Sequence, residues 1–395
     1  MMRLRGWYRC FTSTPRLAAG GLNYVLLDSK IHKRLSYMQP QRWIGCLLFI
    51  LGLPSSILLL HTDPPLAVCL SAPVLILLVT FSFHMLENSL VYAREEPAHS
   101  RLWCDSPEDH GFQVWESVNI YPDGNGGPKV TGFLLFNEDA TARTICPTIY
   151  LLHGNAGNIG HRLPLCRLLA DHVHCNLFLI DYRGYGRSSG IPSEPGLYAD
   201  AQAGLDYLLS RLDIASDRIF VFGRSIGGAV AIHLSTCEKN SSIRGVIIEN
   251  SFTSLPSVAR HIFGATCGLL RDFLPSWIFV NKYPSYDRLK TYIANCQDLH
   301  PRFLFISGDV DEVIPSEMMK KLSVVYAHSE TSTSTFQNAV TPAEFLSSRK
   351  DGLVVFSGGK HNTTWLCPNW AAVISHFIQQ TCAYYSSAKS NAAIV

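Results

Sequence analysis

The chain has 395 residues, of which 47% are hydrophobic and 16% are charged. This composition excludes a disordered chain, because there is ample apolar material for a core, and the charged share lies below the roughly 25% usual for soluble domains. A formal net charge of +2 gives no signal for nucleic-acid binding, so we expect no nucleic-acid partner. The cysteines are scattered without a Cys-x-x-Cys pair, which argues against a zinc knuckle or a thioredoxin-type site.

Residues 1–42 form a basic N-terminal flank in which the only acid is Asp28. A basic flank next to an apolar stretch is typical of the cytosolic side of a membrane anchor. The segment Met1–Leu27 contains arginines and no acids, which is also compatible with mitochondrial targeting. The sequence favours the flank over the targeting peptide, because the apolar stretch follows directly.

Residues 43–84 form a predicted membrane-anchor region with two uncharged apolar runs, Trp43–Leu60 and Leu66–Phe83. As a helix, each run would rise about 27 Å, close to the roughly 30 Å hydrocarbon core of a bilayer. One spanning run gives a single-pass protein of type II, whereas a hairpin of both runs leaves the remaining chain facing the cytosol. A buried core helix is the alternative to both.

The third zone, residues 105–385, alternates short apolar runs with helical stretches. Val114–Tyr121 and Val130–Phe136 flank the turn Asp123–Gly127, and this pattern predicts an antiparallel hairpin. The continuous apolar runs that follow indicate buried parallel strands; they are Thr148–Leu152, Leu177–Ile180, Ile219–Phe222, Gly245–Ile248, Phe303–Ile306 and Leu353–Phe356. We therefore expect an α/β fold with a mostly parallel central sheet and helices on both faces.

The sharpest local signal is Gly223-Arg-Ser225-Ile-Gly227-Gly228. It follows the apolar run Ile219–Phe222 directly and precedes the helix-like segment Ala229–Cys237. A Gly-x-Ser-x-Gly pattern between a strand and a helix is typical of a nucleophile elbow, in which the serine hydroxyl is exposed on a strained turn. The sequence thus predicts Ser225 as a nucleophile.

A serine hydroxyl is a weak nucleophile at neutral pH and needs a base. α/β-Hydrolases carry serine, acid and histidine in that chain order. After the run Phe303–Ile306 comes Asp311, our predicted acid, with Asp309 as the runner-up that could instead cap the turn. After the run Leu353–Phe356 comes His361, our predicted base, and all these positions follow the carboxyl ends of predicted strands.

The glycine-rich turn His153–Gly157 follows the predicted strand Thr148–Leu152. Such a turn can direct a backbone N–H at a developing oxyanion. We predict an oxyanion hole made by the backbone N–H groups of Asn155 and Ile226. His153 is predicted to order this loop rather than to transfer protons.

Three further segments have less direct roles. Asp181–Ser188 is predicted to be a structural loop, in which the charged side chains hold backbone groups. A predicted lid at about residues 252–295 is rich in aromatic side chains, which suits either an acyl chain or the packing of a small helical cap; they are Phe252, Phe263, Phe273, Trp277, Phe279, Tyr283 and Tyr286. The Ser/Thr-rich segment Glu330–Ser348 is predicted to be a surface insertion.

Four stretches closely resemble the α/β-hydrolase domain-containing proteins, a membrane-anchored serine-hydrolase family; they are His153–Pro164, Asp181–Gly186, Phe222–Leu234 and His361–Trp365. The resemblance covers nearly all of Leu86–Val395. It implies Ser225, Asp311 and His361 as the catalytic triad, a single-pass type II anchor aligned best with the second apolar run, no metal and no organic cofactor. The basic flank, the first apolar run and Glu330–Ser348 depart from the family pattern.

Relatives in the family include protein depalmitoylases, so the resemblance implies cleavage of an acyl ester or thioester in a lipid or an acylated protein. A serine peptidase of related fold is the competing enzymatic hypothesis. The non-enzymatic alternative is a membrane scaffold that offers its C-terminus, Ala393–Val395, to a carboxylate-binding groove. Asn240 and Asn362 fit the N-glycosylation pattern, which is usable only in a lumenal domain.

Overall fold

The computed structural model describes residues 87–89, 91–266, 276–295, 301–327, 339–347 and 352–392. The basic flank, both apolar runs and the C-terminal Ala393–Val395 lie outside these residues, so the expectations for them remain predictions. Within the described ranges, no helix combines the length and the apolar character needed to cross a bilayer. The chain divides into two compact units, and the unit made of Tyr92–Ser276 and Asn281–Val395 contains the whole sheet.

The sheet has eight strands in the order β1-β2-β4-β3-β5-β6-β7-β8. Only β1 with β2 and β2 with β4 pair antiparallel, and the other neighbours pair parallel. The strands are β1 (Trp115–Ile120), β2 (Val130–Leu135), β3 (Thr148–Leu152), β4 (Asn176–Asp181), β5 (Ile219–Arg224), β6 (Ile243–Glu249), β7 (Arg302–Gly308) and β8 (Gly352–Phe356). The predicted hairpin and all six predicted buried strands are confirmed to within a few residues.

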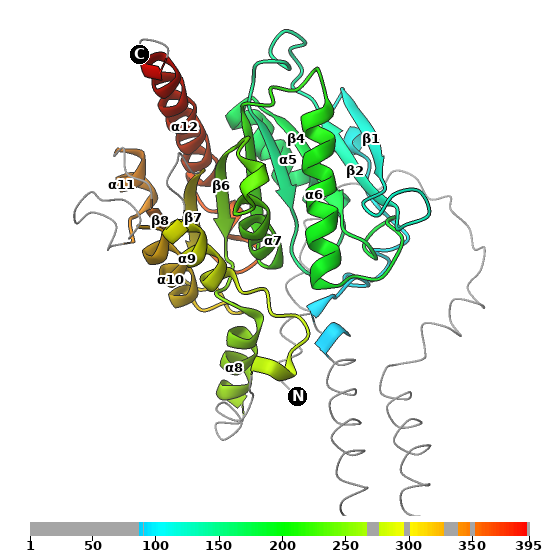
Figure 1. Ribbon diagram of the computed structural model, residues 1–395, viewed down its shortest axis with the longest axis vertical. Coiled ribbons are helices and arrows are strands. Elements are labelled where there is room, and N and C mark those ends of the chain that lie inside the picture. The colour runs from blue at the N-terminus through cyan, green and yellow to red at the C-terminus, as the bar shows by residue number, and fades with distance from the viewer. Residues whose placement is uncertain are drawn as a thin grey trace, which may run out of the picture. The chain divides into compact units, whose positions relative to one another are not determined.

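Helices cover both faces of this sheet. On one face α5 (Leu163–Val173) and α11 (Pro342–Leu346) pack against α12 (Trp370–Ala392), which contacts β6. Further helices lie in front of the strands in Figure 1, where α7 packs on β5 and β6 and α10 packs on β7; they are α6 (Glu194–Ser210), α7 (Ile226–Ser235), α9 (Ser285–Asn295) and α10 (Ser316–Ala327). The expected three-layer α/β arrangement is confirmed.

The side chains of strand β3 pack into the helix layers on both faces of the sheet. Ile149 and Leu151 belong to the apolar cluster that includes residues of α5 and α12. Tyr150 points to the other face, where its hydroxyl donates to the Ala201 carbonyl on α6 at 3.2 Å. Because side chains alternate along a strand, a strand buried on both faces needs the continuous apolar run that the sequence shows.

Short 3-10 helices complete the described elements; they are η1 (Pro107–His110), η2 (Gly160–Arg162), η3 (Glu238–Asn240), η4 (Ser276–Ile278) and η5 (Thr364–Leu366). Asn240 of η3 is buried, and its amide donates to the Gln202 side chain at 2.8 Å and to the Leu234 carbonyl at 2.7 Å. A glycan on Asn240 is incompatible with this packing. Of the two glycosylation patterns, only that of Asn362 stays compatible with the fold.

The prediction that Glu330–Ser348 is a surface insertion is wrong for its C-terminal part. Val340 bridges to Val354 of β8, and its N–H donates to the Leu353 carbonyl at 3.0 Å. Phe345 of α11 is buried in the apolar core. Because Ser and Thr dominate the segment, its composition did not reveal these two apolar residues. Val340 extends the edge of the sheet, and Phe345 covers it. Residues 330–338 and 348 lie outside the described part.

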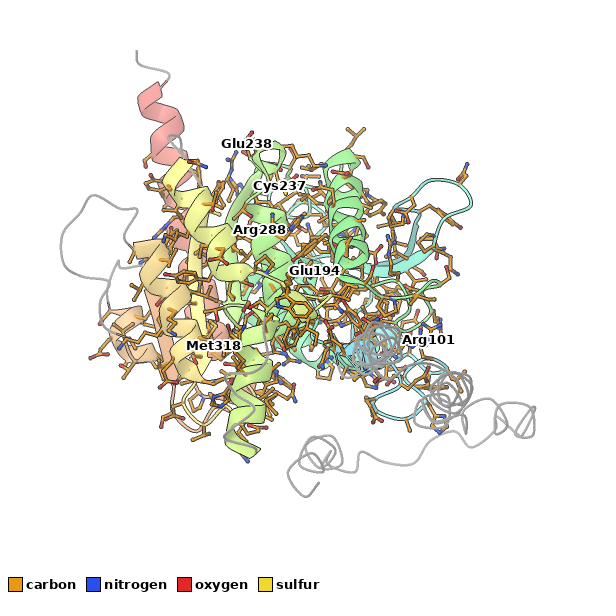
Figure 2. The ribbon with its side chains drawn as sticks, turned by 60° about the horizontal axis from the view of Figure 1, so that its bottom comes forward. Arg101, Glu194, Cys237, Glu238, Arg288 and Met318 are labelled. Carbon is orange, nitrogen blue, oxygen red and sulfur yellow. The ribbon has the colours of Figure 1, made fainter. Side chains whose placement is uncertain are left out.

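The predicted lid region is partly described, as α8 (Leu255–Thr266), η4 and α9. Figure 1 shows α8 standing apart from the strands. In contrast, α9 packs against α7 and α10, and its Arg288, labelled in Figure 2, lies 5.8 Å over the Tyr198 ring of α6. Phe252 and Tyr283 are buried in contact with each other. These two aromatic residues therefore serve ordinary packing, which is one of the two roles that the sequence left open.

Candidate active site

Ser225 lies in the turn between strand β5 and helix α7. Its φ of 57° and ψ of −123° fall outside the regions that L-residues normally adopt. Arg224 ends the strand and Ile226 begins the helix, so the chain changes from strand to helix at this one residue. This is the strained geometry of a nucleophile elbow, and the glycine-rich pattern around Ser225 predicts it.

Gly227 shows why the elbow requires a glycine after the serine. A Cβ on Gly227 would lie 2.0 Å from the carbonyl oxygen of Leu152 and 2.6 Å from that of His153. A larger residue would therefore push α7 away from the end of β3. The close packing also brings Ser225 to the loop after β3, because a Cβ on Gly154 would lie 3.5 Å from the Cβ of Ser225.

The predicted acid and the predicted base are in direct contact. Oδ2 of Asp311 lies 2.9 Å from Nδ1 of His361, and both side chains are almost completely buried. The other oxygen, Oδ1, accepts the N–H groups of Val313 and Ile314, each at 2.8 Å. The carboxylate is thus fixed from both sides, and it can hold the imidazole in one orientation.

Asp309, the other aspartate that the sequence offered as the acid, makes a different contact. Its Oδ1 accepts the N–H of Gly358 at 2.7 Å, in the turn that follows β8. Asp309 therefore holds the loop that leads to His361, whereas Asp311 contacts the imidazole itself. A turn-capping role is common for aspartate beside glycine.

Ser225 and His361 lie at the same edge of the sheet, at the carboxyl ends of β5 and β8. The N–H of Ser225 donates to the carbonyl of Glu249 at 3.0 Å, and the next residue, Asn250, donates through its side chain to the carbonyl of His361 at 3.1 Å. Within the described residues, the Ser225 hydroxyl makes no hydrogen bond to His361. Catalytic hydrogen bonds are often long in structures without substrate, so this half of the predicted triad stays a prediction.

The two predicted oxyanion donors belong to the helix that follows Ser225 and to the loop that follows β3. Ile226 is the first residue of α7, so its N–H has no partner within the helix. Asn155 is adjacent to Gly154, whose Cβ position lies 3.5 Å from the Cβ of Ser225. Neither N–H finds an acceptor in the part of the chain that the structure describes. The positions suit an oxyanion hole, and this assignment also remains a prediction.

A buried polar group beneath the elbow was not foreseen from the sequence. Glu249 ends β6, and its Oε2 accepts the indole N–H of Trp370 at 2.5 Å, while its Oε1 lies 3.9 Å from Nη1 of Arg224. Burial raises the pKa of Glu249 and lowers that of Arg224. In the sequence, the signal that could have found it is that the apolar strand β6 ends on a charged residue, Glu249, at the sheet edge where the site is predicted.

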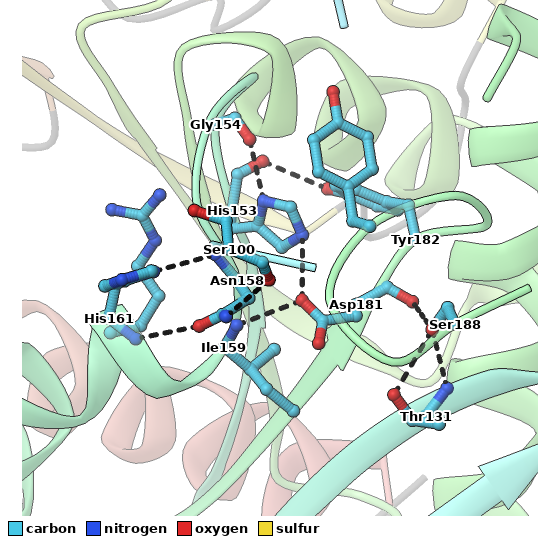
Figure 3. A network of polar contacts seen from close by, with 12 residues as sticks. Ser100, Thr131, His153, Gly154, Asn158, Ile159, His161, Asp181, Tyr182 and Ser188 are labelled. Carbon is cyan, nitrogen blue, oxygen red and sulfur yellow. Dashed lines mark hydrogen bonds and ion pairs between the residues drawn. The ribbon is translucent and has the colours of Figure 1, made fainter. Parts of the chain in front are cut away.

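His153 and Asp181 form a second buried pair, shown in Figure 3. Nε2 of His153 lies 3.8 Å from Oδ1 of Asp181, and Nδ1 contacts the Gly154 carbonyl at 2.7 Å. Burial lowers the pKa of His153 to about 3, which keeps the imidazole neutral, and raises the pKa of Asp181 to about 7. Asp181 also accepts the N–H of Ile159 at 3.0 Å, so it holds backbone groups as the sequence predicted.

Comparison with known proteins places the chain among hydrolases. Residues 144–291 match the family described as serine aminopeptidase, S33. The protein bem46 of Schizosaccharomyces pombe is 33% identical over 59% of this chain and 72% of its own length. The α/β-hydrolase domain-containing protein WAV2 of Arabidopsis thaliana is 38% identical over 69% of this chain and 76% of its own. An uncharacterized membrane protein of Saccharomyces cerevisiae, YNL320W, is 31% identical over 60% and 76%.

The fold is also that of a solved enzyme. The Pyrococcus furiosus esterase Pf2001 superposes with a TM-score of 0.51 at 16% identity, over 71% of this chain and 95% of that protein. At this identity the likeness shows the fold alone. With an elbow after β5 and a sheet of this order, the fold and the two well-covered relatives lead to one conclusion: the chain belongs to the α/β-hydrolase domain-containing proteins related to bem46.

Proposed function

We propose that the chain is a membrane-anchored serine hydrolase that cleaves an acyl ester or thioester through Ser225, Asp311 and His361. The observation that carries the proposal is the 2.9 Å contact between Asp311 and His361 at the sheet edge where Ser225 occupies a strained elbow. A buried acid–imidazole pair and an elbow serine at one edge are the parts that acyl transfer to serine needs.

In the proposed reaction, His361 takes the hydroxyl proton while the oxygen of Ser225 attacks the acyl carbonyl carbon. The N–H groups of Asn155 and Ile226 stabilise the resulting oxyanion, and Asp311 stabilises the imidazolium. The tetrahedral intermediate then expels the alcohol or thiol, which receives the proton from His361. Water, deprotonated by His361, attacks the acyl-enzyme; the second tetrahedral intermediate then breaks the bond to Ser225 and releases the carboxylic acid, while His361 returns the proton to the oxygen of Ser225.

A fluorophosphonate probe tests the nucleophile directly, because it reacts covalently with an activated serine. We expect labelling of the wild type and of Ser254→Ala, and none of Ser225→Ala. Ser254 is a matched control, since it is a serine whose hydroxyl, among the described residues, contacts Ser257 and the backbone N–H of that residue. Equal labelling of wild type and Ser225→Ala would remove Ser225 as the nucleophile.

A serine peptidase is the second candidate, because the family description that matches residues 144–291 names an aminopeptidase. An amide has a poorer leaving group than an ester or a thioester, so a peptidase must protonate the departing amine efficiently. Turnover on a panel of acyl thioesters, lipid esters and dipeptide amides separates the two functions. Faster cleavage of the amides than of the esters would establish the peptidase.

If the chain is a non-enzymatic scaffold, the fluorophosphonate probe should not label it. A folded chain in native membranes that no fluorophosphonate labels would favour a non-enzymatic role, with Ala393–Val395 as the segment offered to a partner. The contact between Asp311 and His361 argues for the enzyme, because a scaffold has no need of an oriented imidazole.

A further inference from the structure

A segment that precedes the sheet runs along the loop after β3. We call residues Ala93–Asp105 the strap, and His153–Gly157 the oxyanion loop. Ala93 forms a parallel bridge with Ala156, and the N–H of Gly157 donates to the Glu96 carbonyl at 2.6 Å. The strap thus makes backbone contacts to two of the five residues of the oxyanion loop.

Asn158 joins the strap to the end of the oxyanion loop. Its Nδ2 donates to the carbonyl of Ser100 at 2.8 Å and to that of Trp103 at 2.6 Å, and its Oδ1 accepts the N–H of His161 at 3.3 Å. Figure 3 shows Asn158 between Ser100 and His161. The side chain is fully buried, so no water replaces these partners, and only a carboxamide supplies two donors and an acceptor in this geometry.

Gly160 shows how tightly the strap and the segment after the oxyanion loop pack. A Cβ on Gly160 would lie 2.5 Å from the backbone nitrogen of Asp105. The backbone of the strap and the backbone at Gly160 are therefore in direct contact, with no side chain between them. A shift of the strap is transmitted directly to residues 156–160.

Side chains from the body also hold the oxyanion loop. The Tyr185 hydroxyl donates to the carbonyl of Asn155 at 3.1 Å, and the Arg162 guanidinium donates to the carbonyl of Ala156. The peptide groups around Asn155 are therefore held both by the body and by the strap. The body and the strap together therefore set the direction in which the Asn155 N–H points.

We propose that Asn158 is a positioning residue, which orients the N–H of Asn155 by tying the strap to the oxyanion loop. The inference rests on the proposed function, in which this N–H stabilises the oxyanion. An oxyanion donor must lie about 2.7–3.1 Å from the developing charge. A misplacement of about 1 Å can lower turnover by about 10²-fold, even when the cause lies away from the reacting atoms.

The test compares Asn158→Asp with Asn176→Asp in the full-length protein in membranes. Both exchanges keep the shape of the side chain and replace two donors with an acceptor. Asn176 is a matched control, because it is also fully buried, donates to the Arg143 carbonyl at 2.9 Å and accepts the Asn137 N–H at 3.0 Å. It begins β4, at the amino edge of the parallel strands, which is the edge away from Ser225.

We measure kcat and KM for a short-chain activated ester, the inhibition constant of an alkyl boronic acid that forms a tetrahedral adduct with serine, and the thermal midpoint. Rates are normalised to the folded fraction. For Asn158→Asp we expect kcat to fall by about 10²-fold and the boronic acid to bind correspondingly more weakly, with KM within about twofold of wild type. For Asn176→Asp we expect a lower thermal midpoint and wild-type kcat per folded molecule.

Equal kcat values for the two variants would overturn the proposal. If Asn158→Asp does not fold, Asn158→Ala decides, because it removes the donors to the Ser100 and Trp103 carbonyls without burying a carboxylate. The expected loss of kcat per folded molecule is again about 10²-fold, and an unchanged kcat would reject the idea. A wild type without Ser225-dependent labelling would instead reject the proposed function, and this result tells the two failures apart.

Discussion

At the scale of single residues, two aspartates only two positions apart have separate roles. Asp311 contacts the imidazole of His361, and Asp309 holds the turn at Gly358. An amide in place of the Asp311 carboxylate stabilises the wrong tautomer of the imidazole and removes the charge that balances the imidazolium. For Asp311→Asn we expect kcat on an activated ester to fall by about 10⁴-fold.

The control for this prediction is Asp309→Asn. Its amide oxygen can still accept the N–H of Gly358, so we expect a change in unfolding free energy of about 0.5 kcal/mol or less and turnover near wild type. If both variants lost turnover to the same degree, the acid would not be assigned to Asp311.

The buried pair His153–Asp181 predicts a specific pH dependence of stability. Burial raises the pKa of Asp181 to about 7, so between about pH 4 and pH 7 the folded protein holds a proton that the unfolded chain releases. The contribution of this carboxyl to stability is therefore present at low pH and is lost as the pH rises to about 7. His153, with its pKa lowered to about 3, acts in the opposite direction, because the folded state excludes its proton.

Asp181→Asn removes the pH-dependent contribution of the Asp181 carboxyl to stability and leaves the contribution of His153. The difference in unfolding free energy, variant minus wild type, should rise between about pH 4 and pH 7, by at most about 1.4 kcal/mol per pH unit. Denaturant unfolding at several pH values measures this difference. A difference that stays constant over the window would show that Asp181 is charged in the folded protein throughout.

At the scale of elements, the sequence predicted the strands best where each one is apolar throughout. Six buried runs were identifiable because a strand covered on both faces has no polar side. The segment before β8 was misjudged because its composition is dominated by Ser and Thr, although Val340 and Phe345 are in contact with the sheet and the core. One buried side chain, Phe345, and one partly buried side chain, Val340, decide the place of this short segment, and composition does not reveal them.

Phe345→Ala tests this correction. The ring is 1% exposed, so its removal leaves a cavity in the core, and we expect a loss of about 3–5 kcal/mol in unfolding free energy. Leu212→Ala is the control, because Leu212 is fully exposed and should change stability by about 0.5 kcal/mol or less. Similar small losses for both would mean that Phe345 lies on the surface.

At the scale of the whole molecule, the proposed membrane anchor leads to a testable orientation of the hydrolase body. A single spanning run after a basic flank places residues 105–385 across the membrane from the flank. In sealed endoplasmic-reticulum vesicles we therefore expect this body to resist added protease until detergent is present. Its degradation in intact vesicles would favour the hairpin, and co-purification with mitochondria would favour the targeting peptide.

The same arrangement would make Asn362 available for glycosylation, because the pattern is usable only in a lumenal domain. We then expect Asn362→Gln to migrate faster than wild type on a gel, and glycosidase treatment to abolish the difference. Asn240→Gln should leave the mobility unchanged, since the Asn240 side chain is buried.

The sequence by itself predicted a serine, an acid and a histidine in the chain order that acyl transfer to serine needs. Ser225, Asp311 and His361 each follow an apolar run, and the carboxyl ends of parallel strands meet at one edge, so local pattern and sheet geometry suffice to group them. Only the tertiary structure separated Asp311 from Asp309 and revealed Glu249 beneath the elbow, Phe345 in the core and the contacts of Asn158 with the strap. These depend on contacts between residues far apart in the chain, whose distances no local pattern encodes.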